Sequence, residues 1–484
     1  MFNKLHKFNF NMVHIILIAI FYNAMLLPYF VVPVIIGGGI TYPWYFIFIN
    51  LFLLFYIIIN PSKFISKIKT ICQFKATRVL LTFIICQIIL SIIHIVIGNS
   101  NIFKPFITLL FRATFTIVPL FFGFLLLSYF RTRIIIKVIF CSLYLIMLFG
   151  IIDFSIFYFD ISILKKIYFF FVNDRVLLQG ISETKSFVGN LPRIQSTFVE
   201  PAFLAYFLNM HLPLIYNLSF SKYKIFDNIY LNKFLKMTLP VITWFVIIGM
   251  QSPIHLIFDI LITVGYIIIK KRISLRKIFI IFIISTVIVY ILINISHLFL
   301  FGESNSSFRR LYIVFNCLTN FNMLVFVEPS LATRIGTYAN EIAIFVKHPF
   351  IGCGIGNFVE AFSRQISTNS PVLLTEELVI GHVIGKRAVN ASILYSFLAE
   401  VGIIATTIYY LFIYTLQNTI RNLSKYTLGI EKDFLIGYIY FLVLYIILSF
   451  YEAFFNYFWL EFGIIIGFIS VIKRRCRNAC TNCK

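Results

Sequence analysis

The segment 193–201 brings an arginine, a glutamine and a glutamate to the start of an apolar run. Pro201 suits the first position of a helix, because its φ is already near the helical value and it has no N–H to leave unpaired. Glu200 is then the cap of that helix or a general base, while Arg193 and Gln195 offer donors to a bound anion. The structural alternative is that Glu200 only caps the helix and Arg193 reaches lipid headgroups.

A second arginine stands near a carboxylate further along the chain. Arg334, Tyr338 and Glu341 have the i, i+4 and i+7 spacing that places side chains on one face of a helix. A guanidinium binds phosphate oxygens through two parallel hydrogen bonds and stays charged. Two such arginines above one membrane surface predict a site for a lipid-linked diphosphate, with Arg193 and Arg334 on opposite walls. A solvated helix face is the alternative for the Arg334 group.

The helix that carries Arg334 is predicted over 331–347. Ser330 is its expected N-cap, and His348 with Pro349 ends it. An apolar stripe predicts that this helix lies flat on the membrane or on the helical bundle. The stripe consists of Leu331, Ile335, Tyr338, Ile342 and either Phe345 or Val346.

Other titratable residues are candidates for proton transfer or charge stabilisation. His382 is a possible general base beside Glu200, with an exposed loop residue as the alternative. Charged residues inside apolar spans are costly and therefore functional candidates, although a buried structural pair explains each equally well. They are Arg112, Asp153, Asp259, Glu400 and Glu461. Arg112 stands roughly 10 Å below the outer surface, where it can face the site from beneath.

Three further histidines are expected to be packing residues. His94, His211 and His255 lie in or at the edges of apolar spans, where we predict no acidic partner for them. No metal-ligand set and no cofactor site is predicted anywhere in the chain.

The composition requires membrane helices to position these residues. The 484 residues are 60% hydrophobic and 12% charged, whereas soluble domains are about half apolar and about one quarter charged. The soluble globular class is therefore excluded. Runs long enough to cross a hydrocarbon core of about 30 Å predict about twelve spans. They lie near 13–36, 40–59, 79–97, 105–130, 134–158, 201–218, 237–250, 253–269, 278–300, 391–416, 434–450 and 454–472.

The net charge is +23, and the basic residues that produce it are interpreted as markers of cytoplasmic loops rather than as a nucleic-acid-binding surface. Most Lys and Arg residues fall on one side of the predicted spans, which places both termini in the cytoplasm. The first span is expected to be a retained helix rather than a cleaved signal peptide. The main basic segments are 60–78, 131–137, 219–236, 270–277 and the tail 473–484.

Two outer loops, 159–200 and 301–390, are too long to be simple connections. The expected architecture is thus one all-α membrane domain over 1–484, with a large helical extracytoplasmic loop before the tenth span. Within that loop, the glycines of 352–358 predict a tight turn with positive φ, and a dinucleotide loop is the weaker alternative. Asn390 is the expected cap of the tenth span.

Two outer cysteines leave a choice open. Cys317 and Cys353 can pair in an oxidising compartment or remain as free thiols.

The order of these features resembles the O-antigen polymerase and ligase superfamily. The resemblance rests on the predicted twelve spans, the run 193–201, the segment 334–358 and the segment 390–402. It implies a metal-independent inner-membrane glycosyltransferase that acts outside the cytoplasm on undecaprenyl-diphosphate oligosaccharides, with Arg193 and Arg334 as diphosphate ligands. Expected partners are this lipid-linked substrate, membrane lipid and a chain-length regulator protein, without nucleic acid.

One departure from the family pattern favours a polymerase over a ligase. Ligases usually have a histidine close before the asparagine that starts the tenth span, but Val389 precedes Asn390 here and the nearest histidine is His382. The leading prediction is therefore a repeat-unit polymerase for O-antigen or capsule. A ligase that moves finished glycan to lipid A core or protein is the first alternative, and a glycolipid flippase is the second.

Overall fold

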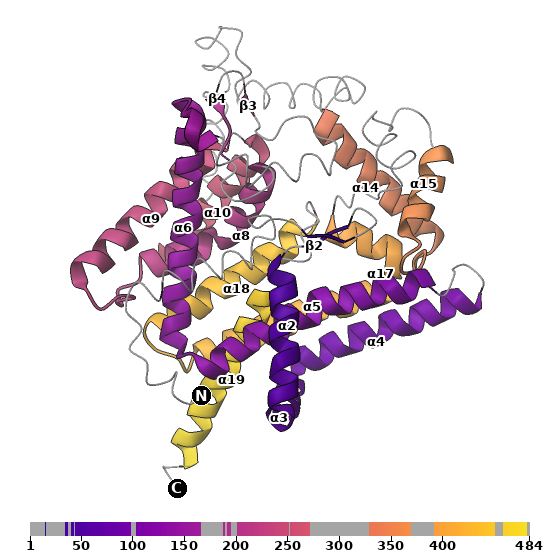
Figure 1. The fold of residues 1–484 in the computed structure, drawn as a ribbon, viewed down its shortest axis with the longest axis horizontal. Helices are drawn as coiled ribbons and strands as arrows, with labels where there is room; N and C mark the ends of the chain where they lie inside the picture. The colour runs from indigo at the N-terminus through magenta and orange to yellow at the C-terminus, as the bar shows by residue number, and fades with distance from the viewer. Residues whose placement is uncertain are drawn as a thin grey trace. The chain divides into compact units, whose positions relative to one another are not determined.

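The computed structural model is almost entirely helical in the residues that it describes (Figure 1). These are 15, 34–36, 40–42, 44–97, 103–165, 187–188, 191–194, 201–250, 252–271, 329–368, 392–450 and 458–481. The predicted all-α class is confirmed for this part, apart from two short hairpins. Chain contacts divide the protein into two compact units. The first unit is Met1–Phe48, Tyr129–Asn316 and Tyr426–Phe441, and the second is Ile49–Ser128, Cys317–Lys425 and Leu442–Lys484.

Four described helices are long and apolar enough to cross a membrane, which indicates a membrane protein. They are α4 (Lys75–Val96), α6 (Thr132–Tyr158), α9 (Ile229–Gly249) and α17 (Ile393–Ser424). The full set of twelve spans stays a prediction, since those near 13–36 and 278–300 fall largely or wholly outside the described residues.

The first unit is built around α8 (Pro201–Ser219), which packs against α6, α9 and α10 (Pro253–Lys271). Every α8 residue from 204 to 219 is buried, as expected for a predominantly apolar helix that lies in a core. Pro201 is the first residue of this helix, which confirms its predicted position. The unit also contains the first part of α18 (Ile430–Leu448) and two hairpins. The hairpins pair β1 (Val34–Ile36) with β2 (Ile40–Tyr42), and β3 (Phe187–Val188) with β4 (Leu191–Pro192).

The second unit is built around α17, which packs against α4, α14 (Pro329–Lys347) and α19 (Trp459–Thr481). Aromatic rings hold α17 to α19, where Phe412 stacks on Trp459 at 5.9 Å between ring centroids. The other elements of this unit are most of α2 (Trp44–Ile59), α3 (Pro61–Cys72), α5 (Phe103–Tyr129), α15 (Phe358–Thr368) and the end of α18.

Several helices begin at residues other than the first residue of the predicted apolar span, and side-chain capping fixes the start of two of them. Helix α9 begins eight residues before the predicted 237, because the Asn228 side chain accepts hydrogen bonds from the backbone of Tyr230 and Leu231. Helix α17 is capped by Ser392, whose hydroxyl accepts from the Tyr395 N–H at 3.2 Å. Asn390, the predicted cap, lies outside the described residues.

The first residues of α14 and α2 also differ from the predicted ones. Helix α14 begins at Pro329, so Ser330 lies inside it and does not cap it. The predicted span 40–59 is a helix only from Trp44, since Ile40–Tyr42 pairs as a strand.

Close packing of α5 against α19 gives a test of the second unit. A Cβ on Gly463 would collide with the backbone carbonyl of Leu120, which cannot move aside as a side chain can. Gly463→Ala should therefore lower the free energy of unfolding by about 1–3 kcal/mol, measured by detergent-induced unfolding of the purified protein. Gly265→Ala is the matched control, because nothing lies within 4 Å of its new methyl group. Equal stability of the two variants would contradict the α5 and α19 contact.

Candidate functional site

Helix α17 is interrupted at Gly402, which has φ 72° and ψ 179°. This conformation is accessible to glycine but not to most other residues. The break removes helical hydrogen-bond partners from the neighbouring backbone at a buried position, where unpaired groups are costly. The chain must therefore supply other partners there.

Those partners come from the glycine turn, which we define as residues 349–357. The Cys353 N–H donates to the Ala399 carbonyl at 2.8 Å, and the Gly354 N–H donates to the Glu400 carbonyl at 3.0 Å. The Ile403 N–H donates to the Pro349 carbonyl at 2.9 Å. The glycine turn thus docks into the break of α17 through backbone hydrogen bonds on both sides of Gly402.

Glycine is required in the turn for both conformation and space. Gly352, Gly354 and Gly356 all have positive φ, at 69°, 97° and 80°. A Cβ on Gly352 would lie 2.6 Å from the backbone nitrogen of Val401, and one on Gly354 would lie 2.7 Å from the ring of His94. The predicted tight turn with positive φ is confirmed.

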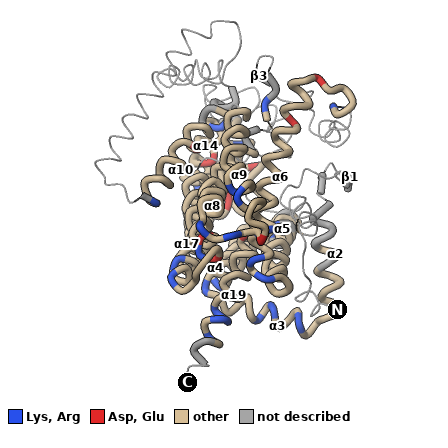
Figure 2. Tube along the Cα trace, turned by 90° about the vertical axis from the view of Figure 1, so that its left-hand side faces the viewer, with Lys and Arg blue, Asp and Glu red and all other residues tan. Residues whose placement is uncertain are grey.

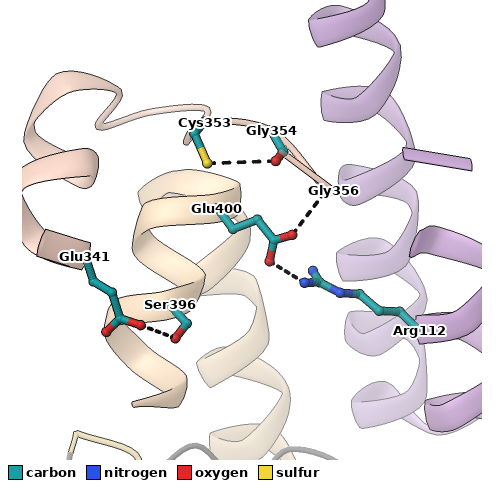
Figure 3. A network of polar contacts seen from close by, with 7 residues as sticks. All are labelled: Arg112, Glu341, Cys353, Gly354, Gly356, Ser396 and Glu400. Carbon is teal, nitrogen blue, oxygen red and sulfur yellow. Dashed lines mark hydrogen bonds and ion pairs between the residues drawn. The ribbon is translucent and has the colours of Figure 1, made fainter. Parts of the chain in front are cut away.

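An ion pair between the half-buried Arg112 and the buried Glu400 lies beneath the turn (Figure 3). Arg112 on α5 donates through Nη2 to Oε2 of Glu400 on α17. The second carboxylate oxygen accepts from the Gly356 N–H at 3.2 Å. The Glu400 side chain is only 7% exposed, so its charge depends on these two donors. Both residues were intramembrane candidates with a buried structural pair as the alternative, and the structure pairs them with each other.

One nitrogen of Arg112 is not used by this pair. Its Nη1 is buried and has no hydrogen-bond partner among the described residues. A guanidinium held by Glu400 on one side can therefore offer a donor to another anion.

His94 on α4 lies against the same turn and was missed as a site residue by sequence reasoning. Its ring is buried, and Nε2 lies 3.4 Å from the Ile351 carbonyl. Its Nδ1 has no hydrogen-bond partner among the described residues. The available signal was its position, because His94 lies near the outer end of its predicted span 79–97, on the same side of the membrane as Arg112 in the span 105–130.

Helix α14 buries polar residues and leaves part of its predicted apolar stripe exposed. It buries Thr337, Asn340 and Glu341 completely, while Ile342 is 42% and Val346 is 68% exposed. Of the two surfaces predicted for the stripe, the membrane or the bundle, the bundle does not cover these two residues. In a membrane, lipid tails solvate apolar side chains, so the polar face is the one that gains from packing inside.

Two of the three predicted residues on α14 contact α17. Glu341 accepts a hydrogen bond from the Ser396 hydroxyl at 2.6 Å, and Tyr338 lies over Tyr395 at 5.5 Å between ring centroids (Figure 3 shows the Glu341 contact). The solvated-face alternative is thus wrong for Glu341. Arg334 lies one turn before Tyr338 and is partly buried.

Arg193 belongs to the first unit and closes a helix end there. Its Nε donates to the carbonyl of Met250, the C-cap residue of α9, at 3.0 Å. The adjacent Ile194 is fully buried, and its N–H donates to the Gly249 carbonyl at 2.9 Å. A cation at a helix C-terminus also interacts favourably with the helix dipole. Gln195, Glu200 and His382 lie outside the described residues.

A second buried polar group links α8 and α10 in the first unit. Asn209 donates to Asp259 at 2.6 Å and contacts Nδ1 of His255 at 2.9 Å. His255 was expected to have no acidic partner, but Asn209 connects it to Asp259. His211 is a packing residue as expected, stacked on Phe207 at 4.0 Å between ring centroids.

The thiol in the glycine turn is buried and free. Burial raises the pKa of Cys353, and the nearby Glu400 carboxylate raises it further while Arg112 acts in the opposite direction. Of the two alternatives for this residue, the structure shows the free thiol. Among the described residues, no group of three or more His, Cys, Asp or Glu side chains is placed to hold a metal.

Comparisons with known proteins add no family assignment. No protein-family model matches the chain, and no curated protein matches it.

Replacing Gly402, whose positive φ forms the break in α17, should release the glycine turn from that helix. Gly402→Ala places a methyl group against the Phe350 backbone and disfavours the required φ. Gly429→Ala is a close control, because Gly429 also has φ 72° but has open space around it. In a variant that keeps only Cys353, maleimide labelling at neutral pH should be slow and should accelerate roughly tenfold or more in Gly402→Ala. Equal acceleration by both changes would mean that strain, not docking, controls the turn.

The ion pair should show strong coupling in a double-mutant cycle. Arg112→Ala leaves a buried carboxylate without its cation and should cost about 3–5 kcal/mol of unfolding free energy. In a Glu400→Gln background the same change should cost far less, because no charge is left unpaired. Detergent unfolding of the four proteins gives the coupling energy. Independent, additive costs would show that the pair is not formed.

Proposed function

We propose that this chain is a membrane glycosyltransferase that polymerises a polysaccharide. It transfers a growing glycan from undecaprenyl diphosphate to a lipid-linked repeat unit at the outer face of the bacterial inner membrane, with both chain termini in the cytoplasm. The observation that carries the proposal is the Arg112–Glu400 pair beneath a glycine turn that fills a broken membrane helix. Ionisable residues at such a place are costly and are usually kept for function.

The depth of this site suits a substrate held at the membrane interface. Glu400 stands eight residues after Ser392, the cap of α17, which corresponds to roughly 12 Å along the helix. A diphosphate anchored by a polyprenyl chain lies near the headgroup level, within reach of a long arginine. The unused nitrogen of Arg112 supports a role in binding that anion.

The reaction requires little beyond charge stabilisation and a base. An oxygen of the acceptor sugar forms a bond to the anomeric carbon of the donor glycan, and the bond from that carbon to the diphosphate oxygen breaks. The diphosphate leaves with the electron pair, and arginines stabilise its developing charge. The hydroxyl proton passes to a base. In the second unit, His94 has the chemistry of that base, because Nδ1 is available when Nε2–H donates to Ile351. Glu200 and His382 remain sequence-based candidates for the same role.

The two arginines of the outer loops are proposed to bind the diphosphate. Arg334 is partly buried on α14, whose polar face packs on α17 beside the broken helix. Arg193 uses Nε to hold a backbone carbonyl, so its terminal nitrogens are oriented by a fixed stem.

A glycolipid flippase is the second candidate, and one observation favours it. Discontinuous membrane helices such as α17 are typical of transporter binding sites. Purified protein in detergent micelles separates the two functions, because there is no bilayer to cross. A polymerase lengthens a defined lipid-linked repeat unit there, whereas a flippase does not.

Loss of either outer arginine should abolish polymer in cells. Arg193→Ala and Arg334→Ala should leave membrane insertion intact but give lipid-linked glycans of single-unit length on gels. Arg193→Lys should also lose most activity, since an ammonium lacks the planar fork. Arg421→Ala, an exposed position at the end of α17, is the control and should retain polymer. Normal polymer length in either alanine variant would disprove the diphosphate role, and full-length polymer left unattached would identify a ligase.

A further inference from the structure

The second unit contains an apolar cavity away from the glycine turn. Its volume is about 350 Å³, and it lies among α2, α3, α4 and α5. The lining is almost wholly aliphatic and aromatic, with Leu53, Phe64, Ile68, Leu81 and Ile117 among its residues. A cavity with such a lining suits a hydrocarbon chain.

Helix α3 forms one wall and is amphipathic. Phe64, Ile68 and Ile71 face the cavity, whereas Lys63 and Lys69 are exposed. A short helix with an apolar face and a lysine-rich face is typical of the membrane interface. Helix α3 therefore brings positive charge to the edge of the apolar cavity.

The end of α19 adds cations at the same edge, although it is remote in sequence. Lys473 places Nζ 5.2 Å from the centre of the Phe74 ring, in the turn that joins α3 to α4. Lys67 is partly buried, which lowers the pKa of its ammonium, and the charge of Arg474 lowers that pKa further. Lys and Arg residues mark both α3 and the end of α19 (Figure 2). Two elements thus bring like charges together.

No acid balances this cluster within the described chain. Among the ion pairs of the described residues, none includes Lys67, Lys473 or Arg474. Holding like charges together beside an apolar cavity is unfavourable unless an anion is present. A ligand that joins an anionic group to a hydrocarbon chain would neutralise the basic cluster and fill the apolar cavity.

We propose that this place is a binding site for an anionic phospholipid. One acyl chain occupies the cavity between α2, α3, α4 and α5, and the phosphate lies against Lys67 and Arg474. On the predicted topology, α3 and the end of α19 face the cytoplasm, where basic pockets at helix ends bind anionic lipid headgroups. The inference does not depend on the reaction proposed above, because the site involves neither the glycine turn nor Arg112.

Native mass spectrometry of the full-length, delipidated protein tests the site. Phosphatidylglycerol should remain bound and raise the melting temperature, whereas phosphatidylcholine with the same chains should bind at least tenfold more weakly. Inorganic phosphate alone should have no effect, because it cannot fill the cavity. Equal retention of the two phospholipids would overturn the proposal, since only an unspecific apolar groove would remain.

Variants separate the charge from the cavity. Lys67→Gln with Arg474→Gln should weaken phosphatidylglycerol binding by about fivefold for each cation removed. Lys222→Gln with Lys224→Gln removes the same charge from exposed positions of the first unit and should change nothing. Leu81→Trp keeps every charge but fills the cavity, and it should also remove the lipid. Wild-type binding by both test variants, or equal loss in the control, would refute the site.

Discussion

The second unit depends on one backbone interaction, the docking of the glycine turn into the break of α17. A helix that loses hydrogen bonds inside a membrane must recover them from the protein, because lipid offers no donors or acceptors. The amides of Cys353 and Gly354 and the carbonyl of Pro349 do this for the positions around Gly402. This close approach requires glycine in both segments, the turn and α17. It also holds the Gly356 N–H against the carboxylate of Glu400.

The charged residues of the site follow from that docking. Once Glu400 is held in a buried place, a cation must compensate it, and Arg112 reaches it from α5. The polar face of α14 packs on α17 for a related reason, since the buried Glu341 accepts a hydrogen bond from Ser396. The proposed transferase chemistry would use the part of this network that is not internally satisfied, which includes one nitrogen each of Arg112 and His94 among the described residues.

Local rules predicted the single elements well and the contacts between them poorly. Pro201 begins its helix and the glycines of the turn have positive φ, because proline and glycine fix the backbone by their own chemistry. The pairing of Arg112 with Glu400 spans 288 residues, which no local pattern reports. For the α14 stripe, sequence left the membrane and the bundle as alternatives, because lipid tails and a protein interior both accept apolar side chains; in the structure Ile342 and Val346 are exposed. The break at Gly402 was missed since a single glycine inside a helix is often tolerated.

Hydrogen exchange at the backbone of the glycine turn tests the central claim most directly. The amides of Cys353 and Gly354 donate to carbonyls of α17, so a peptide covering 349–358 should exchange as slowly as the buried part of α17 itself. Exchange in that peptide should accelerate in Gly402→Ala, while peptides from α8 in the first unit stay unchanged. Exchange of the wild-type turn within seconds, at the rate of an exposed loop, would contradict the docked turn and the site built on it.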